Sequence, residues 1–361
     1  MSEVNQTPKV MIMAGGTGGH VFPGIAIAKA LQEQGIAVCW LGTQVGMEQP
    51  WVEKANIPFD AIAIKGLRGK GLLGWLRSPL SVWQATLQAK AIIEQQQPHL
   101  VLGMGGFVCG PGGLAAKLKG LPLVIHEQNA VPGLTNRWLA KLADWVFTAF
   151  PQTVISGEHV QLVGNPVREE LASIATVQPH QPRHLLVLGG SRGALALNEQ
   201  VPKALALLPE SVRPQVWHQT GEKTFQQAQA AYQQAGVSAQ LVPFIEDMAE
   251  AYQWADLVIC RAGALTVSEL MTVARPAILV PFPFAVDDHQ TANAKVLAQM
   301  GGGQVIQQKA LSAEKLQAAL RHWLDQEKLL QASLCLRQQA PQQATQKIVK
   351  KILQILNEPF S

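Results

Sequence analysis

A glycine-rich turn follows an apolar run near the start of each half of the chain. The first turn reads Gly-Gly-Thr-Gly-Gly-His at 15–20, directly after 10–13, and the second reads Gly-Gly-Ser-Arg-Gly-Ala at 189–194, directly after 184–188. Each pattern predicts a buried strand, a tight turn and a helix, because glycine permits sharp turns and close approach of a ligand. The helix start presents unpaired N–H groups and a partial positive charge, which suit a phosphate. The sequence therefore predicts two nucleotide-type halves that face one cleft.

Composition narrows the classes of protein to which the chain can belong. A length of 361 residues favours two domains, and 48% hydrophobic with 15% charged residues excludes a disordered chain. A formal net charge of +4 without a Lys/Arg block argues against nucleic acid as a partner. The four cysteines are scattered and lack zinc-ligand spacing, so we expect buried free thiols in a reducing cytosol and no metal ion. The polar start indicates no signal peptide, and no apolar run is long enough to span a bilayer.

Strand-type apolar runs alternate with helical patterns, which predicts an α/β fold with a doubly wound parallel sheet in each half. In the first half, we expect strands at 9–14, 36–42, 60–64, 99–103, 121–126, 144–148 and 160–163, and helices at 21–34, 80–96, 111–119 and 132–141. In the second half, we expect strands at 184–189, 214–219, 239–243, 256–260, 277–280 and 303–306, and helices at 194–207, 222–234, 246–253, 265–273, 290–299 and 312–324. The stretch 326–346 is expected to be one solvated helix, followed by a short amphipathic helix at 348–356. We expect an N-terminal domain over 1–165, a C-terminal domain over 166–340, and a final segment over 341–361 that packs back on the first domain.

The first glycine turn carries candidate chemistry. His20 lies at or near the following helix start, which disfavours the imidazolium, so we expect a neutral base or hydrogen-bond donor; a structural histidine is the alternative. The turn is not a complete dinucleotide fingerprint, and no acidic residue ends the second strand, 37–41, to bind a nicotinamide ribose. Another glycine-rich strand end at 103–113 would let a bulky ligand approach, or would serve close helix packing.

Polar residues follow the strand at 121–125, where parallel sheets bind their ligands. In the run His-Glu-Gln-Asn at 126–129, Glu127 is expected either to orient a helix or to act in acid–base chemistry, and Asn129 to bind a sugar. Arg168, beside the linker, suits a phosphate, with an ordinary surface arginine as the alternative.

The segment 260–269 is the sharpest candidate in the second half. A strand end, a small-residue turn and a helix start near Leu265 would present amides to a diphosphate. Glu269 can accept hydrogen bonds from vicinal ribose hydroxyls, unless it only pairs with the helix dipole. The run Asp-Asp-His at 287–289 offers metal-ligand types, but adjacent residues rarely point at one ion, so we expect a sugar contact there.

The segment 66–77 interleaves apolar side chains with cations, namely Leu72, Leu73 and Trp75 with Arg68, Lys70 and Arg77. Such a pattern suits the surface of a membrane with anionic lipids, because apolar groups enter the interface while the cations meet headgroups. An ordinary packed loop is the alternative.

Seven segments occur in a fixed order: GGTGGHVFPG at 15–24, GMGGFVCGP at 103–111, HEQNAVPGLTNR at 126–137, GNPVR at 164–168, GGSRGA at 189–194, RAGALTVSE at 261–269 and DHQTANA at 288–294. Together they resemble the MurG family of bacterial UDP-N-acetylglucosamine--N-acetylmuramyl-(pentapeptide) pyrophosphoryl-undecaprenol N-acetylglucosamine transferases, over essentially the whole chain. The resemblance implies a GT-B fold, with two Rossmann-like domains facing a deep cleft, the UDP-sugar on the C-terminal domain and the lipid-linked acceptor on the N-terminal domain. Arg192 stands where many members have Gln, and Ala262 where Ser or Gly is also common; neither departure removes a group that the chemistry needs.

The resemblance also implies roles for individual residues. The donor's GlcNAc and phosphate end would meet Thr17, Gly18 and Gly19. Arg168 and Ser191 would help to hold the diphosphate. The remaining donor contacts would come from Asn129 and Gln290 on the sugar, Ile245 on uracil through its backbone, and Ala264, Leu265, Thr266, Val267, Ser268 and Glu269 along the diphosphate and ribose. His20 matches the family's candidate general base, with Glu127 as our second choice.

The implied reaction is an inverting transfer of GlcNAc from UDP-GlcNAc to the C4 hydroxyl of MurNAc-pentapeptide in undecaprenyl-linked lipid I. It would give lipid II and UDP without a cofactor or metal. The resemblance places the chain at the cytoplasmic side of the inner membrane as a peripheral protein, with other cell-wall synthesis proteins as candidate partners and with links to cell shape and division. Three rival hypotheses are a UDP-GlcNAc 2-epimerase of similar architecture, a nicotinamide-dependent oxidoreductase, and a non-catalytic UDP-sugar sensor or membrane scaffold.

Overall fold

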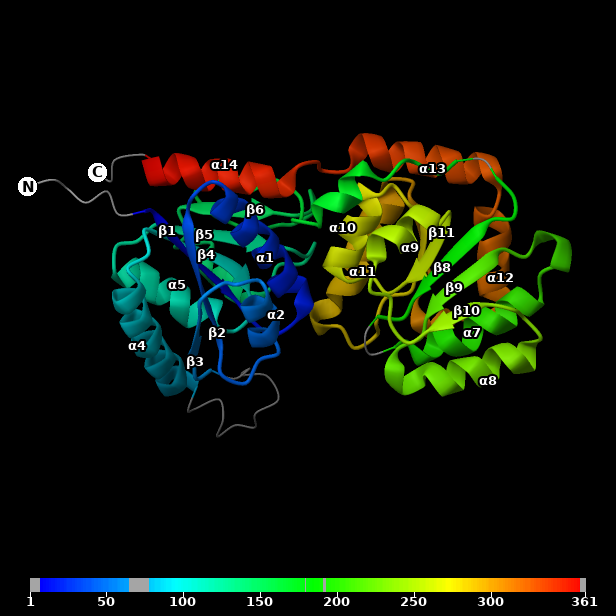
Figure 1. The fold of residues 1–361 in the computed structure, drawn as a ribbon, viewed down its shortest axis with the longest axis horizontal. Coiled ribbons are helices and arrows are strands. Elements are labelled where there is room, and N and C mark those ends of the chain that lie inside the picture. Colours follow the sequence, from blue (N-terminus) through cyan, green and yellow to red (C-terminus); the bar gives the residue numbers. More distant parts are fainter. Residues whose placement is uncertain (1–6, 65–77, 179, 191–192, 358–361) are drawn as a thin grey trace, which may run out of the picture. The chain divides into compact units, whose positions relative to one another are not determined.

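The structure is a computed structural model that describes residues 7–64, 78–178, 180–190 and 193–357. Contacts between residues divide the chain into two units, one formed by Met1–Val167 with Gln342–Ser361 and the other by Arg168–Pro341. Each unit is built on its own parallel sheet (Figure 1). The two sheets confirm the α/β class predicted from the alternation of strands and helices.

The described strands of the first unit form a seven-stranded parallel sheet in the order β3-β2-β1-β4-β5-β6-β7. The strands are β1 (Lys9–Ala14), β2 (Ala37–Thr43), β3 (Phe59–Ile62), β4 (Leu100–Gly105), β5 (Leu123–Glu127), β6 (Trp145–Thr148) and β7 (Val160–Leu162). The helices are α1 (Gly18–Glu33), α2 (Gln49–Lys54), α4 (Ser78–Gln96), α5 (Cys109–Leu118), α6 (Leu134–Leu139) and, from the end of the chain, α14 (Ala344–Asn357).

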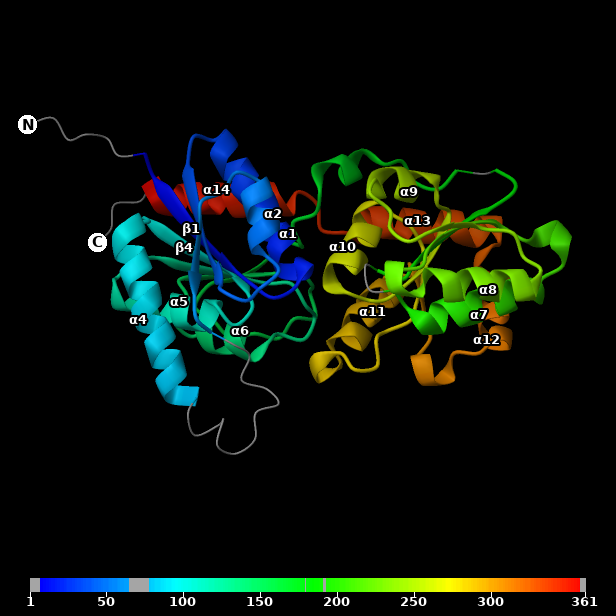
Figure 2. The same ribbon diagram turned by 60° about the horizontal axis from the view of Figure 1, so that its bottom comes forward.

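Alternation along β1 supplies an apolar layer to each face of this sheet, because successive side chains of a strand point to opposite sides. Ile12 is buried in one cluster with Ile352 of α14, whereas Met13 is buried in another with Ala89 of α4 and Ala115 of α5. The helix α14, drawn in red, runs beside α1 in Figure 1, and α4 lies beside α5 in Figure 2. The strand between the two layers is therefore fixed from both sides, which holds the glycine turn at its carboxyl end.

The described strands of the second unit form a six-stranded parallel sheet in the order β10-β9-β8-β11-β12-β13. Its strands are β8 (His184–Leu188), β9 (Gln215–Gln219), β10 (Gln240–Val242), β11 (Leu257–Cys260), β12 (Ala277–Leu279) and β13 (Gly303–Val305). Its α-helices are α7 (Leu195–Ala206), α8 (Phe225–Ala235), α9 (Met248–Trp254), α10 (Ala264–Thr272), α11 (His289–Gln299), α12 (Ala313–Trp323) and α13 (Gln326–Gln339).

The expectation of a single solvated helix over 326–346 is wrong. The helix α13 ends at Gln339, and Ala340 adopts an extended backbone because the following Pro341 disfavours helical geometry at the residue before it. One face of α13 is buried at Leu329, Ala332, Ser333 and Leu336. That i, i+3, i+4, i+7 spacing is the pattern of a helix packed on a core, and it was present in the sequence.

Three smaller expectations also need correction. The helix after the first glycine turn begins at Gly18 rather than at 21, so the expected turn residues lie in its first turn. The short helix α2 was not predicted, because six residues with a proline at their start give little periodicity. Of the four cysteines, Cys335 is half-buried, whereas Cys39, Cys109 and Cys260 are buried and free as expected.

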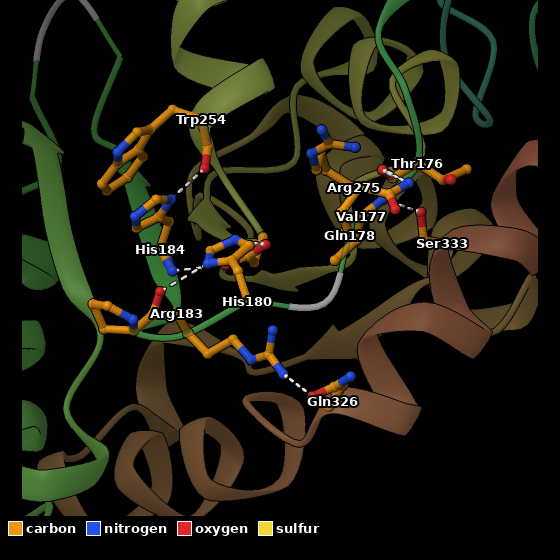
Figure 3. A network of polar contacts seen from close by, with 12 residues as sticks. Thr176, Val177, Gln178, His180, Arg183, His184, Trp254, Arg275, Gln326 and Ser333 are labelled. Carbon is orange, nitrogen blue, oxygen red and sulfur yellow. Dashed lines mark hydrogen bonds and ion pairs between the residues drawn. The ribbon is translucent and has the colours of Figure 1, made fainter.

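The segment that leads into β8 is tied by hydrogen bonds to α13 and, through Ser333, to the turn after α10 (Figure 3). The backbone N–H of Val177 donates to Ser333 Oγ at 3.1 Å, and that hydroxyl donates to the carbonyl of Ala274 at 2.7 Å. Arg183 Nη2 donates to Gln326 Oε1 at 3.0 Å. The central strand of the second unit thus starts from an anchored segment.

Replacement of Ser333 by alanine is expected to lower the free energy of unfolding by about 1–3 kcal/mol, because a buried N–H and a buried carbonyl each lose their partner. Chemical denaturation followed by circular dichroism measures the change. The matched control is Ser173→Ala, at an exposed serine whose loss is expected to change stability by less than about 0.5 kcal/mol. Equal stabilities for the two variants would contradict the anchoring role.

Candidate active site

The candidate residues of each unit collect where the strand order of its sheet reverses. In the first unit, β1 and β4 are neighbours and their following helices leave in opposite directions along the sheet; in the second, β8 and β11 have the same relation. In open parallel sheets this reversal leaves a crevice at the carboxyl ends of the strands, where ligands bind. The two glycine-rich turns stand at the carboxyl ends of β1 and β8. Each sheet therefore has one such reversal, with a glycine-rich turn following one of its two strands.

The loops after β1 and β4 lie against each other. Gly15 N–H donates to the Gly105 carbonyl at 3.4 Å. Gly106 has φ +92°, and a Cβ built there would fall 2.4 Å from the Gly15 carbonyl oxygen. The helix α1 starts at once, with Thr17 as its N-cap and the Thr17 carbonyl accepting from His20 N–H. Thr17, Gly18 and Gly19 thus form the start of α1 itself, at its positive end, whereas the sequence placed them in a turn before the helix.

His20 is half-buried in the first turn of α1 and faces the loops after β4 and β5. Its Nδ1 lies 3.0 Å from Gln128 Oε1. A Cβ built on Gly105 would fall 2.7 Å from the same ring nitrogen, so only glycine leaves room for the imidazole. The neighbouring His126 is fully buried, and burial lowers its pKa to about 4, which leaves it neutral and inaccessible.

Glu127 is buried and accepts hydrogen bonds with both carboxylate oxygens. Oε1 accepts from the backbone N–H and side-chain amide of Asn129, at 2.8 and 3.2 Å. Oε2 accepts from Gly133 N–H at 3.1 Å and from the Asn136 amide at 2.9 Å. Four donors on one carboxylate hold the loop that leads into α6. These contacts favour the orienting alternative for Glu127 over the acid–base alternative, and they position Asn129.

Glu48 was missed by the sequence reasoning. This fully buried carboxylate accepts from Gly16 N–H at 3.4 Å, from Thr43 N–H at 2.8 Å and from Thr43 Oγ1 at 2.6 Å. It lies five residues after the end of β2, beyond the strand end at which a nicotinamide ribose would need an acidic residue. The carboxylate thus connects the glycine turn to the end of β2 by hydrogen bonds. Because Glu48 and Gly16 are 32 residues apart in the sequence, no local pattern predicts their contact.

In the second unit, α10 begins at Ala264, and no side-chain hydrogen bond caps its N-terminus. Gly263 is the N-cap residue, and the first turn holds no acidic residue. Leu265 and Thr266 are half-buried, whereas Val267 and Ser268 are buried. The first amides of α10 therefore offer donors and positive potential to an anion.

Glu269 lies in the same helix and is 6% exposed. Its Oε2 accepts from the Tyr252 hydroxyl at 3.0 Å, and its Oε1 lies 3.6 Å from Arg168 Nη2. Burial raises the pKa of this carboxyl, and the nearby Arg168 guanidinium partly opposes that shift. The structure thus brings together the predicted pair Arg168 and Glu269, and adds Tyr252, which carried no signal in the sequence.

Gln290 joins the loop between β11 and α10 to the loop after β12. Its Oε1 accepts from Ala262 N–H at 3.2 Å and from Phe282 N–H at 2.9 Å. Ile245, predicted to meet uracil through its backbone, lies in the loop between β10 and α9 with its side chain buried. Ser191 and the segment 66–77 lie outside the described residues.

The run 287–289 does not converge on one point. Asp288 Oδ1 accepts from Thr291 Oγ1 at 2.7 Å, and His289 Nδ1 donates to the Val286 carbonyl at 2.6 Å. In the described ranges, the group of metal-ligand types that does converge is His180, His184 and Asp256, within 4.8 Å of one another.

This histidine–aspartate group lies at the amino ends of β8 and β11, at the opposite end of β8 from the second glycine turn. Asp256 Oδ2 accepts from His184 N–H at 2.8 Å, and Asp256 Oδ1 accepts from His180 Nε2 at 2.9 Å. The Nδ1 atoms of the two rings instead donate to backbone carbonyls, His180 to that of Pro182 at 3.0 Å and His184 to that of Trp254 at 2.9 Å (Figure 3). The group therefore belongs to the hydrogen bonding that anchors β8.

Comparison with known families defines the class of the protein. Residues 10–148 match the glycosyltransferase family 28 N-terminal domain, and residues 184–354 match the glycosyltransferase family 28 C-terminal domain. Each match spans one of the two parallel sheets, so the class is that of GT-B glycosyltransferases.

Two similar proteins, one curated and one with a solved structure, narrow this class. The UDP-N-acetylglucosamine--N-acetylmuramyl-(pentapeptide) pyrophosphoryl-undecaprenol N-acetylglucosamine transferase of Hydrogenovibrio crunogenus is 61% identical, over 96% of this chain and 97% of its own. The crystal structure of Acinetobacter baumannii MurG matches with a TM-score of 0.85 and 43% identity, over 96% of this chain and 99% of its own. The chain therefore belongs to the MurG family of N-acetylglucosaminyltransferases.

The chain also shares its fold, and no more than its fold, with a structure of the kind that the epimerase hypothesis invokes. A structure described as a putative UDP-N-acetylglucosamine 2-epimerase from Listeria monocytogenes matches with a TM-score of 0.69 at 14% identity, over 98% of each chain.

Proposed function

We propose that the chain transfers GlcNAc from UDP-GlcNAc to the C4 hydroxyl of MurNAc-pentapeptide in undecaprenyl-linked lipid I, forming lipid II for peptidoglycan synthesis. Membership of the MurG family and the name of the Hydrogenovibrio relative support the substrates. The observation that carries the proposal is the uncapped start of α10 followed, five residues later, by the buried carboxylate of Glu269. That pairing offers an anion site and an acceptor for vicinal hydroxyls on one helix, which a nucleoside diphosphate requires.

The donor is proposed to bind chiefly on the second unit. The amides of Ala264, Leu265 and Thr266 would meet the diphosphate, helped by Arg168 and by Ser191. Glu269 would accept from the ribose hydroxyls through Oε1, since its Oε2 is held by Tyr252. The remaining donor contacts of this proposal are those of Val267 and Ser268 along α10, Ile245 on uracil, Gln290 and Asn129 on the sugar, and Thr17, Gly18 and Gly19 toward the phosphate end.

The proposed chemistry is a single displacement that inverts the α-linked donor to a β-1,4 product. His20 takes the proton of the acceptor hydroxyl as it attacks the anomeric carbon. The bond to the diphosphate breaks at the same time, and UDP leaves with growing negative charge. Preorganised donors such as the α10 amides each contribute about 3 kcal/mol to stabilising such charge. Glu127, our second choice of base, is better suited to holding Asn129 because four donors already satisfy it.

A transfer assay tests this function. Purified protein is mixed with UDP-GlcNAc and a soluble lipid I analogue, with and without a chelator, and the products are identified by mass spectrometry and NMR. We expect a β-linked GlcNAc–MurNAc product and stoichiometric UDP, unaffected by the chelator. Formation of a free 2-epimer from donor alone would favour the epimerase hypothesis, and binding of donor without turnover would favour the sensor hypothesis.

We also propose that the chain docks on the cytoplasmic face of the inner membrane, where the lipid tail of the acceptor resides. None of the helices in the described part of the chain is long and apolar enough to cross a membrane. The candidate contact, 66–77, continues directly into α4, whose side chains Leu80, Trp83 and Leu87 are 61%, 52% and 48% exposed. Their i, i+3, i+7 spacing places them on one face of α4. This apolar face supports docking at that end of the first unit. Roles in cell shape and division are proposed from the family alone, because peptidoglycan synthesis underlies both.

Joint replacement of Leu72, Leu73 and Trp75 by serine is expected to weaken binding to vesicles containing phosphatidylglycerol about tenfold or more, because three interfacial apolar groups are lost. Co-sedimentation with vesicles at low and high salt measures it. The control replaces Leu207 and Val212, exposed apolar residues of the second unit, with serine. Equal sedimentation of both variants and the unmodified protein would contradict docking through this segment.

A further inference from the structure

We infer that Gln128 is a positioning residue that holds His20 in the neutral tautomer protonated on Nδ1, so that Nε2 is the proton acceptor. The geometry of the pair is independent of any substrate. Its consequence for turnover rests on the proposed transfer reaction.

The orientation of the Gln128 amide is fixed by a backbone group. Its Nε2 donates a short hydrogen bond to the carbonyl of Met104, in β4. A carbonyl oxygen can only accept, so the amide nitrogen must face Met104. The opposite orientation would set two oxygens against each other. Gln128 Oε1 therefore faces His20.

The amide in turn fixes the proton on the imidazole. Gln128 Oε1 lies 3.0 Å from His20 Nδ1 and can only accept, so Nδ1 carries a hydrogen. In the neutral ring, the second nitrogen then bears the lone pair. The chain of hydrogen bonds runs from Nδ1–H of His20 to Gln128 and from Gln128 to Met104. These hydrogen bonds leave Nε2 as the basic atom, and the tautomer is set before any substrate binds.

The surroundings of Gln128 prevent it from turning away. Its side chain is 2% exposed, and its backbone carbonyl accepts from Asn165 Nδ2 at 3.1 Å. The absent Cβ of Gly105 lets the His20 ring reach the amide. A buried group with both polar ends engaged has one low-energy position, because any other would leave buried donors or acceptors unsatisfied.

A neutral partner suits this role better than a carboxylate would. A carboxylate beside the ring would favour the imidazolium, which cannot accept a proton. An amide sets the tautomer and orientation of the ring without adding negative charge. Gln128 therefore orients the ring, and His20 accepts the proton.

The tautomer can be measured directly by NMR. Long-range ¹H–¹⁵N correlation is recorded on the full chain labelled with ¹⁵N-histidine, at mildly alkaline pH, and the His20 signals are assigned by their loss in His20→Ala. We expect a protonated Nδ1 and an unprotonated Nε2 for His20 in the unmodified protein. In Gln128→Met, which keeps side-chain length but removes the amide, we expect population of the Nε2–H tautomer. A protonated Nε2 in the unmodified protein would overturn the inference without recourse to any variant.

Kinetics then separate positioning from a merely structural effect. Gln128→Met is expected to lower kcat about 10- to 100-fold, within the range for a mispositioned base, with the donor KM changed less than about twofold. The double variant with His20→Ala is expected to lose no more turnover than His20→Ala alone, because the two residues act as one unit. Losses that multiply would show that Gln128 acts otherwise than through His20. If the unmodified protein transfers no sugar, the proposed function fails while the NMR result still stands.

Discussion

Replacement of His20 by alanine is expected to lower kcat about 100- to 10,000-fold, the range by which a positioned general base accelerates proton transfer. The donor Kd should change little, because the proposed charged contacts to the donor are Arg168, Glu269 and the first amides of α10, not the imidazole. Stopped transfer assays at saturating donor and acceptor give kcat, and calorimetric titration with UDP gives Kd.

The control for this variant is His322→Ala, at an exposed histidine of α12 far along the chain from the site. Its kcat should stay within about twofold of that of the unmodified protein, as for an ordinary surface substitution. Near-normal turnover of His20→Ala would remove the base assignment and leave the acceptor proton to another group.

Replacement of Glu269 by alanine is expected to weaken donor binding about 10- to 150-fold. The estimate follows from about 1.5–3 kcal/mol for hydrogen bonds from ribose hydroxyls to a charged acceptor. The kcat at saturating donor should fall much less, since the ribose lies away from the reacting atoms. Titration with UDP and with uracil alone separates the ribose contribution from that of the base. Unchanged UDP affinity would contradict the ribose assignment.

Donor binding should also depend on pH through this residue. Burial raises the pKa of Glu269, so the carboxylate gains its proton at a higher pH than an ordinary glutamate. As the pH falls through that raised value, the site loses an anionic acceptor and donor affinity should fall. Glu269→Gln should bind the donor weakly, and this position should then contribute no pH dependence to donor affinity.

The stability of the ligand-free protein should change with pH in the opposite direction to donor affinity. Because the pKa of Glu269 is raised in the folded state, stability is lost as the pH rises through that pKa. Glu269→Gln should therefore raise the Tm of the ligand-free protein at neutral pH.

The sheets could be predicted from the sequence because their signal is local. Each buried strand is a short apolar run followed by glycine or a polar turn, as in Val10–Ala14 and the two glycine turns, and parallel strands buried on both faces leave such runs. Predictions from the sequence were wrong where local composition and tertiary packing favour different structures. The stretch 326–346 looked solvated by composition, yet Leu329 and Leu336 of α13 pack inward and Pro341 ends its helical path.

The candidate site could be predicted only in part for the same reason. Glycine turns and the α10 start are contiguous motifs, whereas the groups that orient them come from distant positions. Gln128 meets His20 across 108 residues, Glu48 meets Gly16 across 32, and Tyr252 meets Glu269 across 17. No periodicity or spacing reports such contacts, because they exist only once the strands have taken their order in the sheet.

The most direct test is a crystal structure of the protein with UDP-GlcNAc. The uridine diphosphate is expected on the second unit, with a phosphate oxygen within hydrogen-bond distance of the first α10 amides and both ribose hydroxyls on Glu269. Electron density for the nucleotide on the Gly15–Gly19 turn of the first unit, with Ala264–Glu269 untouched, would contradict the account.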